Sequence, residues 1–497
     1  MAESGTYIAV DLGAESGRVA IAEISNALTL TEAHRFSNGP IEQDGSLRWD
    51  LPAIVTEVKA GIRRALQRAP SPVRGIALDS WGVDFGLIDR SGKLLENPYH
   101  YRDSRTDTMM QRAFDLMPKR QIYRHTGIQF LQFNSIFQLL ATRLSNPDLL
   151  DRADKLIFMA DLVAYHLCRK PFAEYTLAST SQLMDMTTGT WSRPLFEKLA
   201  LPMHLMPDIL KPPAFAANLA PEVAAELAAG PIPVIAAGSH DTACAVAGVP
   251  VAQKDWAYIS SGTWSLMGIE TTHAVINDKT FACLFTNEGG VENTIRLLKN
   301  IMGLWLVQQC RSHWAAQGEH LSYAGLTQQA QQAEPFAGLI DPDYSEFLAP
   351  GHMPDKINRY LKMTGQQTIH DKPRMVRLIL ESLALKYRWA LERLQEVTGR
   401  KINVLHLVGG GIKNELLCRF TADSTAREVI AGPVEATAAG NAIMQAKAAG
   451  QIESLSRGRE IIRNSFNLRH YEPTNTKIWD EMYEKFVQYI PAPESNP

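Results

Sequence analysis

The segment YIAVDLGAESGR at residues 7–18 decides how the start of this chain folds. Its first half is rich in residues that favour strands, Gly13 and Gly17 punctuate its second half, and another apolar run follows at 19–22. A strand, a glycine turn with hydroxyl side chains and a second strand form a hairpin whose backbone N–H groups can cradle phosphate oxygens. Most Gly-Ser turns are only turns, so one hairpin alone is weak support for a phosphate site.

A second segment of the same construction, YISSGTWSL, occupies residues 258–266 in the other half of the chain. It again places serine and threonine hydroxyls around a glycine between two strand-forming runs. Two such hairpins at matching places predict a duplicated α/β fold whose halves close on one nucleotide. We therefore expect the protein to act on a ligand that carries phosphate groups.

Length and charge narrow the class of protein. The chain has 497 residues, of which 45 % are hydrophobic and 21 % charged, values that are ordinary for a globular protein. This length is too great for one core and allows about two to four domains. The 50 basic and 53 acidic residues give a formal charge of −3, which argues against a nucleic-acid-binding surface. We expect small molecules, and no nucleic acid, as partners.

The sequence has only weak signals for membrane insertion, for secretion and for disulfide formation. No apolar run reaches the roughly 18 residues that a membrane span needs, and the first six residues lack a basic region before an apolar one. We therefore expect no membrane partner and a cytoplasmic location. The five cysteines are widely spread without a Cys-x-x-Cys spacing, and we expect them to be reduced packing residues.

The first half of the chain alternates strands with helices. Asp50 is placed to cap a helix over 51–69, and a short strand follows at 73–79. A strand, a helix and a strand in this order predict a sheet with parallel members and covering helices. The stretch 98–213 is more irregular, and we expect it to hold inserted structure that faces the substrate.

Domain boundaries follow from these patterns. We expect an N-terminal domain over 1–248, a C-terminal domain over 249–470, and a last helix with a frayed tail over 471–497. In the second domain a long amphipathic helix at 375–397 should end at Gly399 as a C-cap.

A polar cluster follows the buried strand at 234–238. His240, Asp241 and Thr242 stand at its end, where open α/β sheets place their chemistry. Asp241 can accept a proton from a substrate hydroxyl, or it can merely cap the next helix. The two hairpins favour the first interpretation, because phosphoryl transfer needs a base near the phosphate cradle.

Three consecutive glycines at 409–411 lie between a predicted strand and a predicted helix. Backbone without Cβ atoms lets a ring or a phosphate come close there. The pattern is one residue from a dinucleotide-binding fingerprint, but the next strand ends at 431–433 without the acidic residue that would hold a ribose. This argues against a dehydrogenase.

Other positions have two interpretations each. Asp11 suits a ligand of hydrated magnesium, or it stabilises its turn. Trp81, Gly82 and Asp84 combine an aromatic face, approachable backbone and a carboxylate, as sugar sites do, although Trp81 can equally belong to the core. The charged segment 101–105 is a solvated loop, or a network that binds sugar or organises the core. P-loop, nucleophile-elbow and zinc-helix motifs are absent from the sequence.

Taken together, these segments resemble carbohydrate kinases of the FGGY family over nearly the whole chain. The matching segments are residues 10–18, 79–85, 101–105, 127–130, 239–242, 260–268, 286–290, 298–305, 408–411 and 431–436. The resemblance implies an α/β fold of two actin-like, ribonuclease H-like domains with an active-site cleft between them. It also implies ATP and Mg²⁺ as cofactors, with the N-terminal domain mainly binding sugar and the C-terminal domain mainly binding ATP.

The family resemblance also implies roles for particular residues. Asp241 would be the general base, and the sugar would be lined by Gly82, His240, Asp241, Thr242 and Asn300, with Trp81 and Asp84 beside it. ATP would be held by Ala14, Glu15, Ser16, Gly17, Arg18, Thr263, Gln308, Gly410 and Gly411. Asp11 remains the candidate ligand for Mg²⁺. Asn300 and Gln308 rest on the resemblance alone.

The substrate follows from details within the family. The segments around Trp81 and Asn300, together with NSIFQ at 134–138, resemble the branch that acts on L-rhamnulose and disfavour glycerol or xylulose. The expected reaction moves the γ-phosphoryl group of Mg-ATP to the 1-hydroxyl of that ketose. Glu15 stands where this branch mostly has serine, and a carboxylate facing phosphate is repelled unless it points outward or to magnesium.

Two alternatives stay open. The first is a kinase for another ketose such as L-fuculose, and the second is an actin-like sugar sensor that binds ATP without transferring phosphate. We expect the protein to be a monomer or a small homo-oligomer.

Overall fold

The computed structural model describes residues 4–490. The tail at 491–497, predicted to be frayed, lies outside these residues. The chain forms two compact units, each assembled from separate stretches of sequence. Unit 1 comprises Met1–Pro250, Glu270–Leu297 and Ala436–Ser465, and unit 2 comprises Val251–Ile269, Leu298–Glu435 and Phe466–Pro497.

A six-stranded sheet forms the centre of unit 1. In spatial order its strands are β13 (Ala214–Asn218), β14 (Pro233–Ala236), β6 (Val73–Ser80), β1 (Gly5–Leu12), β2 (Ser16–Ile24) and β3 (Leu28–Ser37). β1 pairs with β2 in the antiparallel sense and with β6 in the parallel sense, and β14 is also parallel to β6. The first predicted hairpin and the predicted parallel strand are both confirmed.

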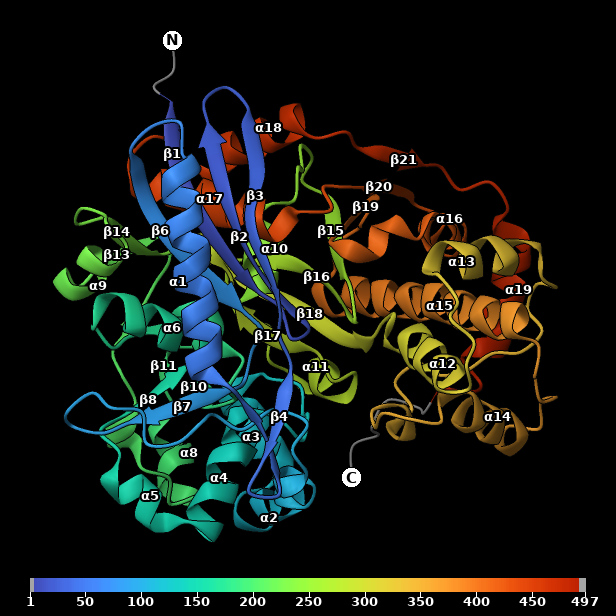
Figure 1. The fold of residues 1–497 in the computed structure, drawn as a ribbon. Coiled ribbons are helices and arrows are strands. Elements are labelled where there is room, and N and C mark those ends of the chain that lie inside the picture. Colours follow the sequence, from blue (N-terminus) through green and yellow to red (C-terminus); the bar gives the residue numbers. More distant parts are fainter. Residues whose placement is uncertain (1–3, 491–497) are drawn as a thin grey trace. The chain divides into compact units, whose positions relative to one another are not determined.

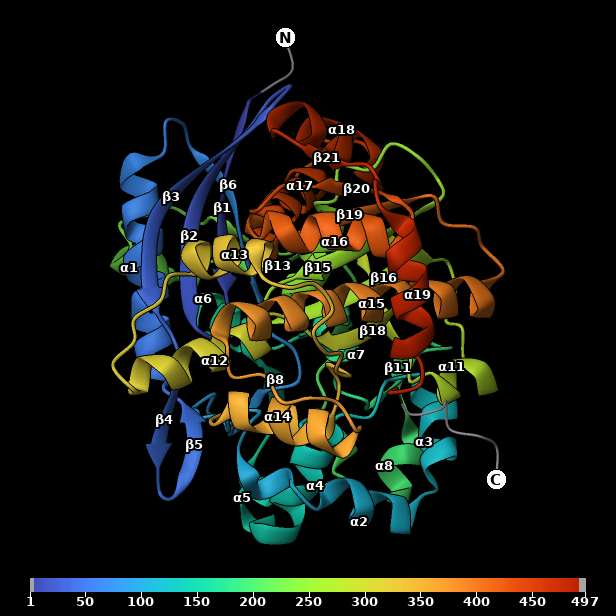
Figure 2. The same ribbon diagram turned by 90° about the vertical axis from the view of Figure 1, so that its right-hand side faces the viewer.

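Helices cover both faces of this sheet. Figure 2 shows α1 (Leu51–Arg68) on one side of β1, β2 and β3 and α17 (Ala436–Ala448) on the other. As predicted, Asp50 caps α1, since its side chain accepts from the Ala53 amide at 3.1 Å. Ile54, Val58 and Ile62 recur at helical spacing and are buried, because this face of α1 packs on the sheet.

The helix pair α10 (Asp241–Ala247) and α17 packs very closely within unit 1. A Cβ atom added to Gly440 of α17 would lie 1.8 Å from the carbonyl oxygen of Cys244, and one added to Gly248 would lie 2.2 Å from that of Ala436. The missing side chains therefore allow backbone to contact backbone. This packing fixes the helix that begins at Asp241.

The inserted stretch of unit 1 is mostly helical. Figure 1 shows the helices within residues 109–152 and 193–198 gathered beyond one end of the sheet, whereas the helix at 159–168 packs on β6. Its elements, with the neighbouring small strands, are β4 (Pro40–Gln43), β5 (Ser46–Trp49), β7 (Phe85–Ile88), α2 (Met109–Leu116), α3 (Lys119–Thr126), α4 (Ser135–Ser145), α5 (Pro147–Arg152), β8 (Lys155–Phe158), α6 (Met159–Cys168), β9 (Ala173–Glu174), α7 (Tyr175–Ser179), β10 (Met184–Asp185), β11 (Thr190–Trp191), α8 (Arg193–Lys198), β12 (Ile209–Leu210) and α9 (Pro221–Glu226). Later in the chain, unit 1 also holds α11 (Asp278–Ala282), β17 (Thr286–Gly289) and α18 (Leu455–Ser465).

Unit 2 repeats the strand plan of unit 1. Its strands include β15 (Trp256–Ser261), β16 (Trp264–Thr271), β18 (Ile295–Met302), β19 (Val404–Val408), β20 (Glu428–Ala431) and β21 (Arg469–Tyr471), of which β16 and β18 each cross a unit boundary. β15 and β16 form the second predicted hairpin, which is confirmed. β19 and β20 follow as parallel neighbours, and β21 closes the edge in the antiparallel sense. In unit 1 a hairpin, two parallel strands and an antiparallel edge strand occur in the same order, as expected for a duplication.

The helices of unit 2 are α12 (Trp305–Ala316), α13 (Tyr323–Gln332), α14 (Met353–Met363), α15 (Lys372–Thr398), α16 (Glu415–Thr425) and α19 (Thr476–Phe486). The longest is α15, and it lies beside α16 in both ribbon views (Figures 1 and 2). Gly399 ends it with φ 67°, a left-handed conformation that glycine adopts without strain. The predicted C-cap is confirmed.

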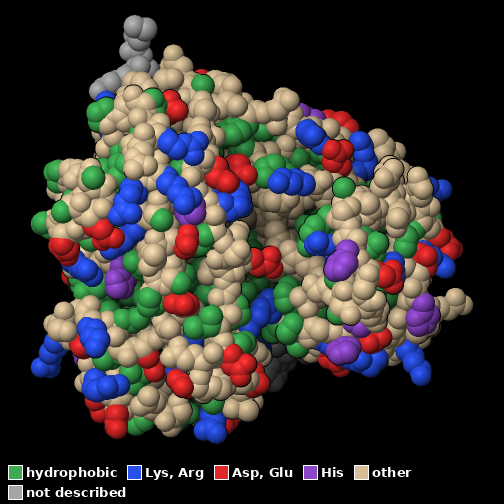
Figure 3. Space-filling view, viewed as in Figure 1, with side chains coloured by type: hydrophobic (Ala, Val, Ile, Leu, Met, Phe, Trp, Pro, Cys, Tyr) green, Lys and Arg blue, Asp and Glu red, His purple; other side chains and the backbone are tan. Residues whose placement is uncertain are grey.

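The distribution of charged side chains and the state of the cysteines are those of an ordinary globular protein. Acidic and basic side chains intermingle on the face drawn in Figure 3. All five cysteines are free and buried, and burial raises the pKa of the Cys244 thiol well above its usual range. Within residues 4–490, no helix has both the length and the apolar character that crossing a bilayer requires.

Candidate active site

The turn of the first hairpin joins β1 to β2. Asp11 and Arg18 face each other across the two strands, and the guanidinium donates to the Asp11 carboxylate at 2.6 Å. At Gly17 an added Cβ would lie 2.1 Å from the Phe36 ring, so any larger residue would force that ring to move. Glu15, at the tip, is exposed, so its charge is solvated in unit 1.

The segment that carries His240 is held by buried polar groups. The Ser239 amide donates to Glu174 at 2.8 Å, the Ser239 hydroxyl donates to Asp161 at 2.7 Å, and the His240 amide donates to the Thr176 hydroxyl at 3.1 Å. Glu174 and Asp161 are fully buried, and burial raises the pKa of both carboxyls. Loss of these contacts would leave buried polar groups unpaired, which is costly. The backbone at residues 239 and 240 is therefore held firmly.

Asp241 begins helix α10. His240 occupies the N-cap position, so Asp241 is not the N-cap residue that the alternative interpretation required. Its carboxylate accepts from the amide of Thr242 at 2.5 Å and from the Thr242 hydroxyl at 3.1 Å, while 32 % of its side chain stays exposed. Burial raises the pKa of Asp241, against the influence of His240, and the charge of Asp11 raises it further. An accessible carboxylate with a raised pKa is suited to accept a proton.

A third carboxylate lies near Asp11 and Asp241. Asp79 is the register partner of Asp11 on the parallel strand β6, and it is fully buried. Its Oδ2 atom accepts from the Asn441 side-chain amide at 2.7 Å. Burial and the charge of Asp11 raise the pKa of Asp79 well above its usual range. No function is predicted for Asp79 from its sequence context.

The pair Trp81 and Asp84 belongs to a buried network. Both indole N–H groups, of Trp49 at 2.7 Å and of Trp81 at 3.0 Å, donate to Asp84. The Tyr101 amide and the Gln138 side chain complete four donors to a carboxylate that is fully buried. A carboxylate has about four lone-pair sites, so here Asp84 orients the indole rings. Burial raises the pKa of Asp84 to about 6. Its predicted contact with sugar stays a prediction. Three of the four donors converge on Oδ2, while Gln138 donates to Oδ1.

Gly82 lies against Thr180. An added Cβ would lie 2.9 Å from the Thr180 hydroxyl oxygen, which also accepts from the Val83 amide at 3.1 Å. Thr242 is nearly buried at the start of α10, and Asn300 on β18 is half-buried.

The second hairpin is joined to helix α12. The Thr263 carbonyl accepts from the amides of Gly303 and Trp305, both at 3.1 Å. One turn into α12, the Gln308 side-chain amide donates to the Thr263 hydroxyl at 3.4 Å. Two residues predicted to hold ATP therefore meet in unit 2. The Gln308 Oε1 atom is buried without a hydrogen-bond partner among the described residues, which is the kind of acceptor that a ligand donor can satisfy.

The triple glycine packs on the same hairpin. Added Cβ atoms would lie 2.9 Å from the Ser261 carbonyl oxygen at Gly409 and 2.1 Å from the Ser261 hydroxyl oxygen at Gly411. Gly409 also has φ 88°. By contrast, an added Cβ at Gly410 would have no neighbour within 4 Å. Gly410 therefore leaves open the approach that a nucleotide needs.

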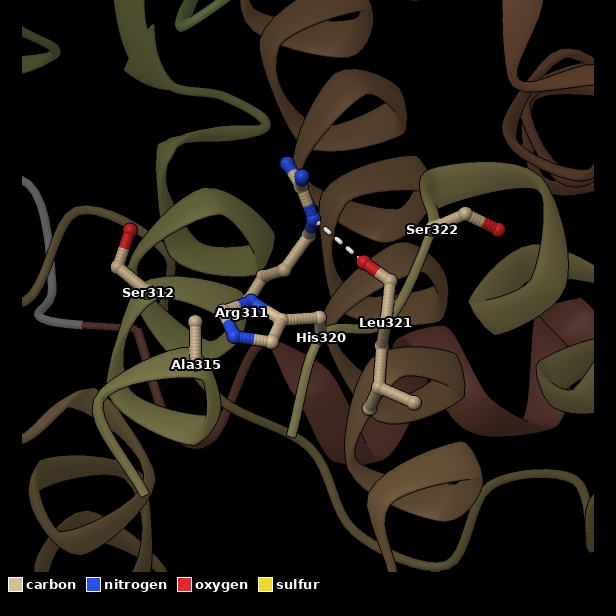
Figure 4. Close-up of a pocket in the computed structure, with 6 residues that line it drawn as sticks. All are labelled: Arg311, Ser312, Ala315, His320, Leu321 and Ser322. Carbon is tan, nitrogen blue, oxygen red and sulfur yellow. Dashed lines mark hydrogen bonds between the residues drawn. The ribbon is translucent and has the colours of Figure 1, made fainter. Parts of the chain in front are cut away.

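A cavity of about 350 Å³ lies elsewhere in unit 2, between α12 and the segment that follows it (Figure 4). Arg311 donates to the Leu321 carbonyl across it at 2.7 Å. None of the residues predicted for the site lines this cavity.

Several residues at the site were missed by sequence analysis. They are the buried polar residues that hold the His240 segment, namely Asp161, Glu174, Thr176, Glu288 and Arg296. One sequence signal was present, since a charged residue within an apolar strand must have a buried partner. Arg296 in IRLL at 295–298 is such a case.

The described part of the chain shows no preformed cluster of metal-binding side chains. Among residues 4–490, no group of three or more His, Cys, Asp or Glu side chains is arranged to hold an ion. Asp11, with its carboxylate 20 % exposed, keeps its predicted role as a magnesium ligand within the proposal below, since hydrated Mg²⁺ needs only one or two carboxylates beside phosphate.

Two α/β units, each built around a glycine hairpin, and a partly exposed carboxylate that follows a strand are the features expected of a sugar kinase with a duplicated fold. Models of the FGGY family of carbohydrate kinases match residues 6–248 with the N-terminal domain and 257–449 with the C-terminal domain, and the chain belongs to this family. Several curated relatives are rhamnulokinases. That of Bacteroides thetaiotaomicron is 42 % identical over 97 % of this chain and 99 % of its own, and that of Enterococcus faecalis is 39 % identical over 98 % of each.

Solved structures confirm the fold class. A ligand-bound xylulose kinase from Lactobacillus acidophilus matches with a TM-score of 0.81 at 17 % identity, over 97 % of each chain. Plasmodium falciparum glycerol kinase with ADP matches with a TM-score of 0.76 at 17 % identity, over 99 % of each. The family resemblance and the two-domain α/β fold expected from the sequence are both confirmed.

Proposed function

We propose that this carbohydrate kinase transfers the γ-phosphoryl group of ATP to the 1-hydroxyl of L-rhamnulose, giving L-rhamnulose 1-phosphate and ADP. The single observation that carries the chemistry is Asp241, an accessible carboxylate with a raised pKa at the start of a firmly held helix. The names of the relatives support the choice of ketose.

In this proposal Asp241 accepts the proton of the sugar hydroxyl as the new P–O bond forms. Backbone N–H groups of the two hairpin turns stabilise the charge on the transferred group. Asp11 would hold Mg²⁺, which neutralises phosphate charge when bound. His240, Thr242, Gly82 and Asn300 orient the sugar.

ATP binding is assigned to the first turn, at residues 14–18, and to unit 2. The open backbone of Gly410 and the unpartnered Oε1 atom of Gln308 suit a nucleotide, since one admits a ring and the other accepts a hydrogen bond. We propose a mainly sugar-binding N-terminal part over 1–248 and a mainly ATP-binding part over 249–470. A cytoplasmic location and a monomer or small homo-oligomer complete the proposal.

A ketose panel tests this function. ADP release, coupled to NADH oxidation, is measured with L-rhamnulose, L-fuculose, L-ribulose and D-xylulose. We expect the highest kcat/KM with L-rhamnulose. A higher value with another ketose assigns a different substrate, and the absence of sugar-dependent ADP release with every ketose favours the sensor. Phosphorus NMR of the product distinguishes the 1-phosphate from other esters.

The pH dependence follows from the raised pKa of Asp241. Protonation abolishes its ability to act as a base, so kcat/KM for the sugar should fall as the pH falls through this pKa. Because burial raises the pKa above the ordinary value of 3.8, the midpoint of the acidic limb should lie above pH 3.8. The measurement is kcat/KM at saturating ATP against pH, with circular dichroism to show that the protein stays folded. A limb centred at or below that value contradicts the assignment.

Gly410→Ala should weaken ATP binding without destabilising the fold. The new methyl group meets nothing in the protein but occupies the open approach, and we expect KM for ATP to rise roughly tenfold, the equivalent of about 1.4 kcal/mol. The thermal midpoint should not change. Gly411→Ala is the contrasting variant, because its methyl group meets Ser261 and should lower the midpoint. Unchanged KM in folded Gly410→Ala would remove Gly410 from the nucleotide site.

A further inference from the structure

Arg296 and Glu288 form a buried ion pair that contacts the His240 ring at Nδ1, while Nε2 is the ring nitrogen near Asp241. Arg296, on the part of β18 that belongs to unit 1, has no exposed surface. Its Nη2 atom lies 2.9 Å from His240 Nδ1 and 3.1 Å from Glu288 Oε2, and its Nε donates to the Gly289 carbonyl at 2.9 Å. Glu288 is also buried, with 4 % exposure. Burying a charge pair this deeply is costly, because both charges lose their hydration. The pair is therefore better explained by a functional role than by a gain in stability.

The contact decides which nitrogen of His240 carries the proton. A guanidinium group only donates and does not lose its proton in proteins. The imidazole atom that faces Arg296 Nη2 at 2.9 Å, Nδ1, must therefore present its lone pair. In a neutral imidazole the proton then resides on Nε2. A proton on Nδ1 would point at a cationic donor, and Glu288 Oε2, at 3.4 Å from Nδ1, is already in contact with Arg296.

The protonated nitrogen faces the catalytic carboxylate. His240 Nε2 lies 3.4 Å from Asp241 Oδ1, the same oxygen that accepts from Thr242. In this tautomer the Nε2–H group is a donor on the Asp241 side of the ring. His240 then has no free lone pair, because Nδ1 accepts from Arg296 and Nε2 is protonated. It can orient a carboxylate or a sugar oxygen, but it cannot remove a proton.

We propose that Arg296 and Glu288 are positioning residues that hold His240 as the neutral Nε2–H tautomer, leaving Asp241 as the only base of the pair. The kinetic consequence rests on the proposed function, whereas the tautomer does not. Arg296 contacts His240, Glu288 and the Gly289 carbonyl. In this scheme it affects the reaction through His240.

The tautomer is measured directly with protein labelled with ¹⁵N at its histidine rings. The chain has 13 histidines, and the signal of His240 is identified by its loss in His240→Gln. At neutral pH we expect one pyridine-like Nδ1 and one protonated Nε2. Arg296→Met combined with Glu288→Gln removes both charges together, and this variant should show a mixture of tautomers. An Nδ1–H tautomer or a doubly protonated ring in the folded wild-type protein overturns the proposal.

Kinetics provide the second readout. In the double variant we expect kcat for the sugar to fall about 10- to 100-fold, the usual worth of a hydrogen bond to a charged group, with KM for ATP unchanged. Arg296→Lys keeps a donor and a charge, and it should recover part of kcat. The matched control removes another largely buried pair of unit 1, through Arg459→Met with Glu270→Gln, whose side chains meet at 2.8 Å.

The outcomes separate the two proposals. Wild-type kcat in the folded double variant, or an equal loss in the control pair, contradicts the positioning role. If the double variant does not fold, the ¹⁵N signals of the wild-type His240 ring and the kcat of Arg296→Lys still test the proposal. If the wild-type protein phosphorylates no ketose, the proposed function fails, while the ring signals continue to test the tautomer.

Discussion

Asp241→Asn is expected to lower kcat at least about 100-fold, in line with the usual contribution of a general base. The amide keeps the shape of the side chain and can still accept from Thr242, which contacts Oδ1 in the parent protein. It cannot take up the hydroxyl proton. Because the loss concerns the chemical step, KM for ATP should change little. The measurement is coupled ADP release with L-rhamnulose at saturating ATP.

Asp148→Asn is the matched control for this variant. Asp148 is an exposed residue in the first turn of α5, also in unit 1. It should leave kcat unchanged, as exposed substitutions usually do. Turnover of Asp241→Asn close to that of the control would show that another group removes the proton. Given the contacts of His240, that group would have to lie outside the pair formed by His240 and Asp241.

Gly440→Ala should produce the largest loss of stability. Its Cβ would lie 1.8 Å from a backbone carbonyl oxygen of α10, and backbone cannot rotate away as a side chain can. Overpacking costs about 3 kcal/mol at the upper end of its usual range, whereas alanine gains about 1 kcal/mol over glycine in a helix. We therefore expect the free energy of unfolding to fall by about 2 kcal/mol or more. Denaturant titration measures it.

Gly230→Ala is the control, because an added Cβ there meets nothing within 4 Å and the residue is exposed. It should change the free energy of unfolding by no more than about 0.5 kcal/mol. Gly440→Ala should also lower kcat, since α10 begins at Asp241. If Gly440→Ala is as stable as the control, α10 and α17 tolerate a wider separation than their contact indicates.

The sequence predicted local elements well because their causes are local. Asp50 ahead of an amphipathic run predicts a capped helix, and the structure has one. Gly399 after such a run predicts its end. The hairpins were predictable from alternating residues around Gly13 and Gly262. The fold followed because the same hairpin occurs twice.

Side-chain roles were harder to predict. Asp84 has the residue type of a sugar ligand, yet here it accepts from Trp49, which lies in another element. Asp79 lies in a segment that resembles the family but has no predicted role, and only its register with Asp11 shows that two carboxylates stand side by side. Such contacts depend on which strands become neighbours, and composition or periodicity does not reveal this.

By itself, the sequence determined the class of fold, the two phosphate-type hairpins, and Asp241 as the candidate base, because turns, caps and strand ends depend on residues close together in the chain. Only the tertiary structure decided how His240 can act. Arg296 follows it by 56 residues in the chain, and β17 and the start of β18 bring Glu288 and Arg296 to the imidazole. A proton's place on a ring is set by the donors and acceptors that folding brings within hydrogen-bond distance.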